Sequence, residues 1–240
     1  MSRLDDARLV REEYASERGL EARRAAYRDA EGDDPRELAF RAVAEVESAH
    51  VLEVGCGPGE LAERIGRELG AAVVAIDQSE RMVQLASARG VDARVGDVQD
   101  LPFADDSFDC AVAAWMLYHL PDLDRGLAEL RRVLRPGGRL VAVTNHHDHL
   151  IELREAIGAA RAFLDSSFSG DNGADVLARH FDRVERRDAA GTATFGDSEA
   201  VASYAQAIMV AADVAGDPYA VDVPLVARRH SAVFVAEKAV

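Results

Sequence analysis

Short apolar runs alternate with helix-length amphipathic segments through the middle of the chain. This pattern is typical of a parallel β-sheet whose strands are joined by crossover helices. The apolar runs predict strands at 51–54, 71–76, 91–95, 108–115 and 139–145. The amphipathic segments predict helices at 59–69, 79–89 and 122–134, and RPGG at 135–138 ends the last of them. The pattern therefore predicts an α/β fold.

The flanking regions are less regular. Residues 4–29 have helical spacing, with Tyr14, Leu20 and Tyr27 as apolar anchors, and 32–35 end the stretch. After the fifth strand, residues 150, 153, 157, 160 and 164 step by three and four, as the buried stripe of a helix does. The pattern after residue 164 predicts a short helix at 173–180, a strand at 183–195, a helix from Asp197 to about 212 and a final strand at 230–238.

Composition and charge limit the class of protein. A chain of 240 residues, 48% of them hydrophobic, is enough for one buried domain. No apolar stretch is long enough for a membrane span, and the N-terminus is charged where a secretion signal is apolar. Cys56 and Cys110 have no disulfide or zinc spacing. The formal net charge of −15, without a basic run, disfavours nucleic acid. We expect a soluble, cytoplasmic protein without nucleic-acid or membrane partners.

The sequence LEVGCGPGEL at 52–61 joins the first strand to its helix through a turn rich in glycine. Gly55, Gly57 and Gly59 permit a sharp turn and a close approach of a ligand to the backbone, although such turns also occur in loops without a ligand. Their G-x-G-x-G spacing differs from the dinucleotide fingerprint, and Glu53 lies just before them. A carboxylate there is a poor neighbour for pyrophosphate and favours a ligand that carries positive charge.

Two further acids follow the next strands. Asp77 ends the second strand, where an acid can accept hydrogen bonds from both hydroxyls of a ribose. Asp97 follows the third strand and can accept from an exocyclic amine such as that of adenine. Taken singly, each could equally be a helix cap or a turn former. In this order and spacing they indicate one extended nucleoside site.

Five motifs in order now resemble a known family. Over residues 50–145 the chain carries LEVGCGPG, AIDQSERM, GDVQDLPFADDSFD, AAWMLYHLPD and ELRRVLRPGG. This region resembles the class I S-adenosylmethionine-dependent methyltransferases, especially those that act on small molecules. The resemblance implies S-adenosylmethionine as cofactor and S-adenosylhomocysteine as product. It also implies a Rossmann-like three-layer sandwich with a seven-stranded, mostly parallel sheet, whose last strand at 230–238 is antiparallel.

The resemblance also implies roles for individual residues. Glu53 and the glycine turn, with Cys56 inside it, face the methionine half of the cofactor. Asp77, followed by Gln78, lies on the ribose. Met82 packs against adenine, while Asp97 and the backbone of Val98 bind the edge of the base. Ala114 and Trp115 lie near the methionyl group.

Methyl transfer from a sulfonium is an in-line displacement, for which the protein aligns the reactants and excludes water. A general base helps only with some acceptors. The catalytic candidates are His119, His146 and Tyr14. A loop hydrogen bond is the alternative role of His119, and packing is that of Tyr14, which otherwise closes over the cofactor.

The histidines of NHHDH at 145–149 follow the fifth strand. His146, His147 and His149 are better explained as contacts to an acceptor than as metal ligands. A site made of His147 with Asp148 or His149 would need adjacent residues to converge on one ion, which is rare. The sequence therefore predicts no metal.

We expect a single domain with a helical extension or lid at 1–45, a cofactor-binding core at 46–147 and substrate-side elements at 148–240. Acceptor recognition is expected from 1–40, from the helix after His149 and from 197–226, which contains Tyr204, Met209 and Tyr219. The spacing of Tyr204 and Met209 favours core packing over a pocket. The expected partner is a small-molecule methyl acceptor, and the expected assembly is a monomer or homodimer.

Alternative functions use the same motifs. A non-catalytic regulatory protein that binds the cofactor or its product would keep all of them. An NAD(P)-dependent oxidoreductase would share the sheet and the ribose acid but needs a turn that accepts pyrophosphate. Protein or nucleic-acid methylation is disfavoured, because AAWM stands at the fourth strand in place of an asparagine-proline motif.

Overall fold

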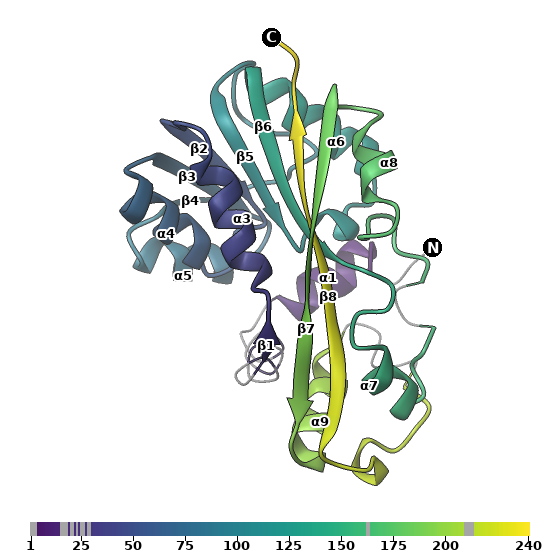
Figure 1. The fold of residues 1–240 in the computed structure, drawn as a ribbon. Helices are drawn as coiled ribbons and strands as arrows, with labels where there is room; N and C mark the ends of the chain where they lie inside the picture. Colours follow the sequence, from purple (N-terminus) through teal and green to yellow (C-terminus); the bar gives the residue numbers. More distant parts are fainter. Residues whose placement is uncertain are drawn as a thin grey trace.

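The computed structural model describes residues 4–14, 19, 22, 24, 27, 30–161, 164–208 and 214–240. These residues form one eight-stranded sheet with helices on both faces (Figure 1). The strands are β1 (Glu31–Gly32), β2 (His50–Val54), β3 (Ala72–Asp77), β4 (Asp92–Val95), β5 (Phe108–Ala114), β6 (Leu134–Asn145), β7 (Arg183–Phe195) and β8 (Leu225–Glu237). The helices are α1 (Ala7–Glu13), α3 (Pro35–Ala44), α4 (Glu60–Leu69), α5 (Glu80–Ala88), α6 (Leu123–Val133), α7 (Ile151–Ala156), α8 (Gly173–Leu177) and α9 (Ser198–Ala207).

The strand order is β1-β7-β8-β6-β5-β2-β3-β4. Strands β2 to β6 pair in parallel, whereas β8 is antiparallel to both β6 and β7. The antiparallel last strand is therefore confirmed. The expected seven strands become eight because β1 adds two residues antiparallel to β7, and a strand of that length leaves no hydrophobic pattern.

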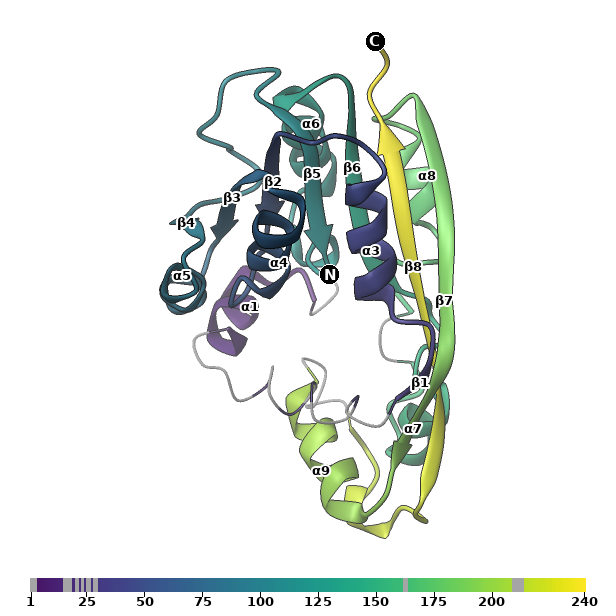
Figure 2. The same ribbon diagram turned by 60° about the vertical axis from the view of Figure 1, so that its left-hand side comes forward.

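Successive residues of the central strands pack against opposite layers, as the pleat requires. On one face, Val51 and Val112 pack with residues of α3 and α4 such as Val43 and Ile65. On the other face, Leu52 and Leu140 pack with residues of α6 and α8, among them Leu127, Leu130 and Leu177. The three-layer α/β sandwich predicted from the sequence is confirmed (Figure 2).

Strands β7 and β8 form a hairpin that is longer than the sheet it joins. Its register runs from Arg183 opposite Glu237 to Phe195 opposite Leu225, but β6 pairs only with 231–237. The remaining part extends past the carboxyl end of β6 and carries α7 and α9 (Figure 1). We call the ends of the hairpin (190–195 and 225–230), together with α7 and α9, the hairpin lobe.

Several boundaries differ from the sequence prediction. The helix expected to continue to 164 ends at Ala156, because Gly158 adopts φ +72°, and Leu164 is 43% exposed rather than buried. Asp197 caps α9 as expected, through a hydrogen bond from the Ala200 amide, but α9 ends at Ala207. Strand β8 begins at Leu225 rather than at 230. Met209 and Leu20 lie outside the described residues.

The N-terminal region also differs from one helical extension. Helix α1 begins after Asp6, whose side chain accepts from the amides of Arg8 and Leu9, and it ends at Glu13. Helix α3 is not part of an extension, because its buried face packs on the central sheet. Within the described residues, no helix has the length and apolar character needed to cross a bilayer.

Candidate functional site

A cavity of about 420 Å³ lies at the carboxyl ends of β2, β3 and β5. It forms there because β3 and β5 flank β2 on its two sides, so their connections leave the sheet in different directions and open a crevice above β2. Residues from the turn after β2, the end of β3, the loop after β4 and the start of the loop after β5 line it. We call it the nucleoside cavity.

The glycines of the turn after β2 have three different structural roles. All have positive φ: +64° at Gly55, +53° at Gly57 and +78° at Gly59. A Cβ at Gly59 would lie 2.6 Å from the Cβ of Ala86, so this glycine lets α4 pack against α5 and does not line the cavity. A Cβ at Gly55 would collide with Met116. At Gly57 nothing lies within 4 Å, so its missing side chain leaves space for a ligand.

Glu53 is a buried carboxyl that faces this space from strand β2. It is only 3% exposed, and burial raises its pKa to about 8. Among the described residues, no side chain or amide hydrogen-bonds its Oε2 atom. A buried polar atom without a partner is costly, and a cationic ligand would relieve that cost. The residues of this cavity therefore fit a nucleoside that carries an ammonium or sulfonium group.

Asp77 lies beside the glycine turn at the end of β3. Its two oxygens accept the amides of Gly57 and Ser79, each at 2.9 Å, while burial raises its pKa. Each oxygen keeps a second lone pair for a ribose hydroxyl. Gln78, Cys56 and Ala114 also line the cavity, and Cys56 is buried.

The expected adenine end is only partly present in the cavity wall. Asp97 is exposed there and accepts the Gln99 amide at 2.8 Å, next to the buried Val98. Met82 is fully buried on α5 and does not line the cavity. Its proposed contact with the base stays a prediction.

A second cavity of about 220 Å³ adjoins the first, and we call it the acceptor cavity. Tyr14, Trp115 and His119 line both. Trp115 is held with φ +55°, and its indole N–H donates to Asn145 Oδ1 at 3.1 Å. Ser231 donates to the same oxygen at 2.8 Å. These two bonds fix the indole at the boundary between the cavities.

Tyr14 and His119, two of the catalytic candidates, are in direct contact. His119 Nδ1 lies 2.8 Å from the carbonyl oxygen of Leu4, which only accepts, so Nδ1 carries the proton. Nε2 is then an acceptor for the Tyr14 hydroxyl at 3.2 Å. Ser79 donates to the Tyr14 carbonyl at 2.8 Å and holds the end of α1 over the site. His119 therefore makes a loop hydrogen bond and also lies in the wall of the site.

A second tyrosine–histidine pair lines the acceptor cavity. The Tyr27 hydroxyl lies 3.0 Å from His149 Nε2, and desolvation lowers the pKa of His149 to about 3, so the ring is neutral at pH 7. His146, the third catalytic candidate, does not line this cavity and faces Asp171 and Asp188 instead. The structure thus brings Tyr14 and His119 together and places His146 elsewhere.

Sequence reasoning missed several lining residues. Arg24 and Arg36 line both cavities, and either guanidinium suits a ligand carboxylate. Tyr204 was assigned to the core, yet it packs against Phe195 and also lines the acceptor cavity. Tyr219 is 56% exposed. The helical spacing of 4–29 indicates only an apolar anchor at Tyr27, because no local signal distinguishes a pocket tyrosine from a packing one.

Comparison with protein families gives a match for the central part of the chain. Residues 52–142 match a family model described as a methyltransferase domain. This segment contains most of β2, the whole of β3, β4 and β5, most of β6 and the whole glycine turn. The match therefore covers the strand ends and the glycine turn of the nucleoside cavity, whereas Tyr14, Arg24 and Arg36, which also line it, lie outside the matched residues.

Relatives and solved structures agree with that match. The chain is 42% identical to methyltransferase GfsG of Streptomyces halstedii over 40% of this chain and 38% of that protein. It is 36% identical to 2-phytyl-1,4-naphtoquinone methyltransferase of Synechococcus elongatus over 44% of this chain and 49% of that protein. The chain thus spans less than half the length of these curated relatives. A putative methyltransferase of Bacillus halodurans shares the fold, with a TM-score of 0.61 at 18% identity, over 86% of this chain and 99% of that one.

Proposed function

We propose that this chain, which belongs to the class I S-adenosylmethionine-dependent methyltransferases, methylates a small aromatic acceptor that binds beside the cofactor. The observation that carries the proposal is the pair of adjoining cavities, which share Tyr14, Trp115 and His119. The nucleoside cavity is the place for the cofactor, and the acceptor cavity is the place for the molecule to be methylated.

S-adenosylmethionine supplies a methyl group activated by a sulfonium. Glu53 and the backbone around Gly57 would hold its methionine half, and Asp77 its ribose. Arg24 or Arg36 would pair with its carboxylate. The buried carboxyl of Glu53 beside the glycine turn disfavours a dinucleotide, because a carboxylate is a poor neighbour for pyrophosphate.

The lining of the acceptor cavity supports an aromatic acceptor. Tyr14, Tyr27, Trp115, Tyr118 and Tyr204 line it, so a planar ring finds aromatic partners there. The neutral His149 adds no charge to this wall. The likeness to a naphthoquinone methyltransferase points the same way.

For a hydroxyl acceptor, we assign proton removal to Tyr14 and His119. Tyr14 lines both cavities, and its hydroxyl donates to His119 Nε2, the ring nitrogen that carries no proton. Tyr14 would accept the proton of the acceptor while its own proton moves to His119. Such a base contributes about 10²-fold or more to the rate.

Calorimetric titration tests the cofactor assignment. The wild-type protein, Asp77→Ala and the control Asp92→Ala are titrated with S-adenosylhomocysteine, NAD and NADP. Asp92 is an aspartate on the neighbouring strand, where it pairs with Arg94 outside the cavity. We expect S-adenosylhomocysteine binding that Asp77→Ala abolishes and Asp92→Ala keeps. Binding of NAD or NADP in its place would favour an oxidoreductase.

An acceptor screen tests the reaction itself. Labelled S-adenosylmethionine is incubated with a panel of naphthoquinols, phenols, aromatic amines and aliphatic amines, and transfer of the label is measured. We expect labelling among the aromatic acceptors. A protein that binds S-adenosylhomocysteine but labels no acceptor would instead be a regulatory binding protein.

A further inference from the structure

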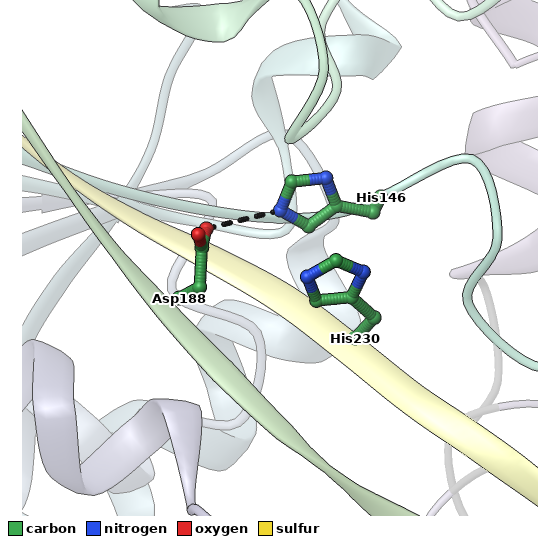
Figure 3. A group of neighbouring side chains, drawn as sticks. All are labelled: His146, Asp188 and His230. Atoms are coloured by element: carbon green, nitrogen blue, oxygen red, sulfur yellow. Dashed lines mark hydrogen bonds and ion pairs between the residues drawn. The ribbon is translucent and has the colours of Figure 1, made fainter.

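Two side chains from strands β7 and β8 and one from the residue after β6 meet on one face of the β7–β8 hairpin. His146 follows β6, while Asp188 and His230 lie on β7 and β8 (Figure 3). Asp188 is opposite Ala232, so it lies diagonally across from His230 on the same face of the sheet. One ligand atom from each of the three side chains lies within 4.8 Å of the others.

The two imidazoles are fixed by packing. The ring of His146 stacks on that of His230, with centroids 3.7 Å apart and planes 14° apart. Gly170 covers His146 as well, because a Cβ at this glycine would lie 2.5–2.6 Å from three ring atoms. The His146 amide also donates to the His230 carbonyl at 3.0 Å. The rings are therefore held in a defined orientation before any ligand arrives.

Each histidine has a carboxylate on its Nδ1 side. His146 Nδ1 lies 3.3 Å from Asp171, and His230 Nδ1 lies 2.8 Å from Asp148. Carboxylates accept protons, so the Asp148 contact favours N–H at Nδ1 of His230 and leaves a lone pair at its Nε2, whereas His146 has a carboxylate beside each ring nitrogen. In Figure 3 both rings turn a nitrogen toward the Asp188 carboxylate, and His146 Nε2 lies 3.1 Å from it. Metal-ligating histidines commonly have this carboxylate behind the ring.

We propose that His146, Asp188 and His230 bind a divalent transition metal ion, with Zn²⁺ as the best match. Two imidazoles and one carboxylate are a ligand set that suits Zn²⁺ and leaves a fourth position for water. Ligand atoms in a tetrahedral zinc site are about 3.4 Å apart, so the ligand atoms, which lie within 4.8 Å of one another, must move closer, and one of the stacked imidazoles must rotate to direct its lone pair at the ion. Asp188 and His230 are partly exposed, which gives the ion a path from solvent.

Arg186 competes with the proposed metal ion for the carboxylate of Asp188. Its Nε lies 3.1 Å from Asp188 Oδ1, and its side chain is 45% exposed. An exposed guanidinium can turn into solvent at little cost, because surface ion pairs contribute only about 0–1 kcal/mol. Metal binding therefore exchanges a weak ion pair for three coordinate bonds.

The bound ion would pin the hairpin to the end of β6. Asn145 and Ser231 immediately adjoin two of the ligands and hold the indole of Trp115 at the acceptor cavity. The role of the metal is thus to position the acceptor wall. It does not contact the reacting atoms.

Cobalt titration tests the site. Tag-free, chelator-treated protein is titrated with Co²⁺, and visible d–d absorption reports coordination by protein ligands. The variants are Asp188→Asn, His230→Asn and the control His180→Asn. His180 Nε2 lies 2.8 Å from Asp124, so the control removes a histidine–aspartate pair without a second imidazole. Circular dichroism and S-adenosylhomocysteine affinity show whether each variant is folded.

We expect one equivalent of Co²⁺ with d–d bands, displaced by Zn²⁺, and a higher melting temperature for the loaded protein. Asp188→Asn and His230→Asn should each weaken Co²⁺ binding by at least about tenfold, and His180→Asn should leave it unchanged. Absence of stoichiometric Co²⁺ binding would overturn the proposal and leave His146 as a histidine hydrogen-bonded to two carboxylates. Unchanged binding in folded Asp188→Asn and His230→Asn would overturn it too. None of these outcomes depends on the methyltransferase assay.

Discussion

Replacing Glu53 with glutamine tests the electrostatic explanation of the glycine turn. Burial raises the pKa of Glu53 to about 8, so at pH 7 about nine in ten molecules without ligand carry this carboxyl in its neutral form. A ligand that brings an ammonium group to this carboxyl favours the ionised form. Below pH 8, ligand binding must therefore be accompanied by loss of a proton.

The size of the effect follows from that pKa. The ionised fraction of Glu53 in the free protein rises from about 1% at pH 6 to about 50% at pH 8. If the complex holds Glu53 ionised throughout, affinity for S-adenosylhomocysteine rises about fiftyfold over this interval, and close to one proton is released at pH 7. Glu53→Gln cannot ionise, so its affinity should change little with pH.

The same pKa determines how stability depends on pH. The folded-state pKa of Glu53 lies above its ordinary 4.5, so the contribution of the neutral carboxyl is complete below pH 4.5 and is lost as the pH rises to about 8. The loss amounts to at most about 5 kcal/mol. Glu53→Gln has no ionisable group at this position, so it does not lose this stability as the pH rises. Its stability relative to the ligand-free wild type should therefore increase from pH 5 to pH 8.

Isothermal titration at about pH 6, 7 and 8, in two buffers that differ in ionisation enthalpy, measures both affinity and proton release. Chemical denaturation at the same pH values measures stability. Glu63→Gln is the matched control, because Glu63 is a partly exposed carboxylate on α4 that pairs with Arg67 and Arg89. The reasoning is refuted if wild-type affinity is independent of pH, or if Glu53→Gln keeps the wild-type dependence.

Two further predictions concern the glycine turn and the tyrosine over it. Gly59→Ala should lower the free energy of unfolding by about 2–4 kcal/mol in urea, because φ is +78° and the new methyl group would meet Ala86. Gly57→Ala should cost only about 1–2 kcal/mol but weaken S-adenosylhomocysteine binding by about tenfold or more, and the reverse ranking would contradict the assigned roles. Tyr14→Phe should cost about 1 kcal/mol of stability through its lost bond to His119. It should also lower kcat about 10²-fold for a hydroxyl acceptor while the cofactor affinity is kept, and unchanged kcat would exclude the proposed proton path.

The cofactor half of the protein was predictable because its signals are local. The strands around Val54 and Asp77 are short apolar runs, and each ends at a polar or glycine position that the parallel topology brings to one edge of the sheet. The inference that Glu53 favours a cationic ligand needed only its position in the sequence, just before the glycine turn. The structure adds what the pattern lacked, namely that Gly59 serves helix packing whereas Gly57 faces open space.

The acceptor half was not predictable because its contacts join distant residues. Tyr27 and His149 are 122 positions apart, and His146 and Asp188 are 42 apart. Spacing within NHHDH indicated only adjacent partners for a metal, whereas the hairpin supplies partners from two other strands. The helix expected to reach 164 shows a second limit, because the apolar stripe continues past the point where Gly158 ends the helical path.

Strands β7 and β8 belong to the central sheet and to the hairpin lobe at once. At thirteen residues each they extend over about 40 Å, so the wall of the acceptor cavity has no sheet of its own and cannot unfold without loosening the core. We expect a single thermal transition for the whole chain. The segments 148–182 and 196–224 connect fixed strand ends, and we expect their exposed parts to tolerate exchange, whereas Phe168, Leu177 and Phe181 belong to the central core. Changes in the exposed parts of these two segments can therefore alter part of the acceptor wall while the strands that carry the cofactor site stay the same.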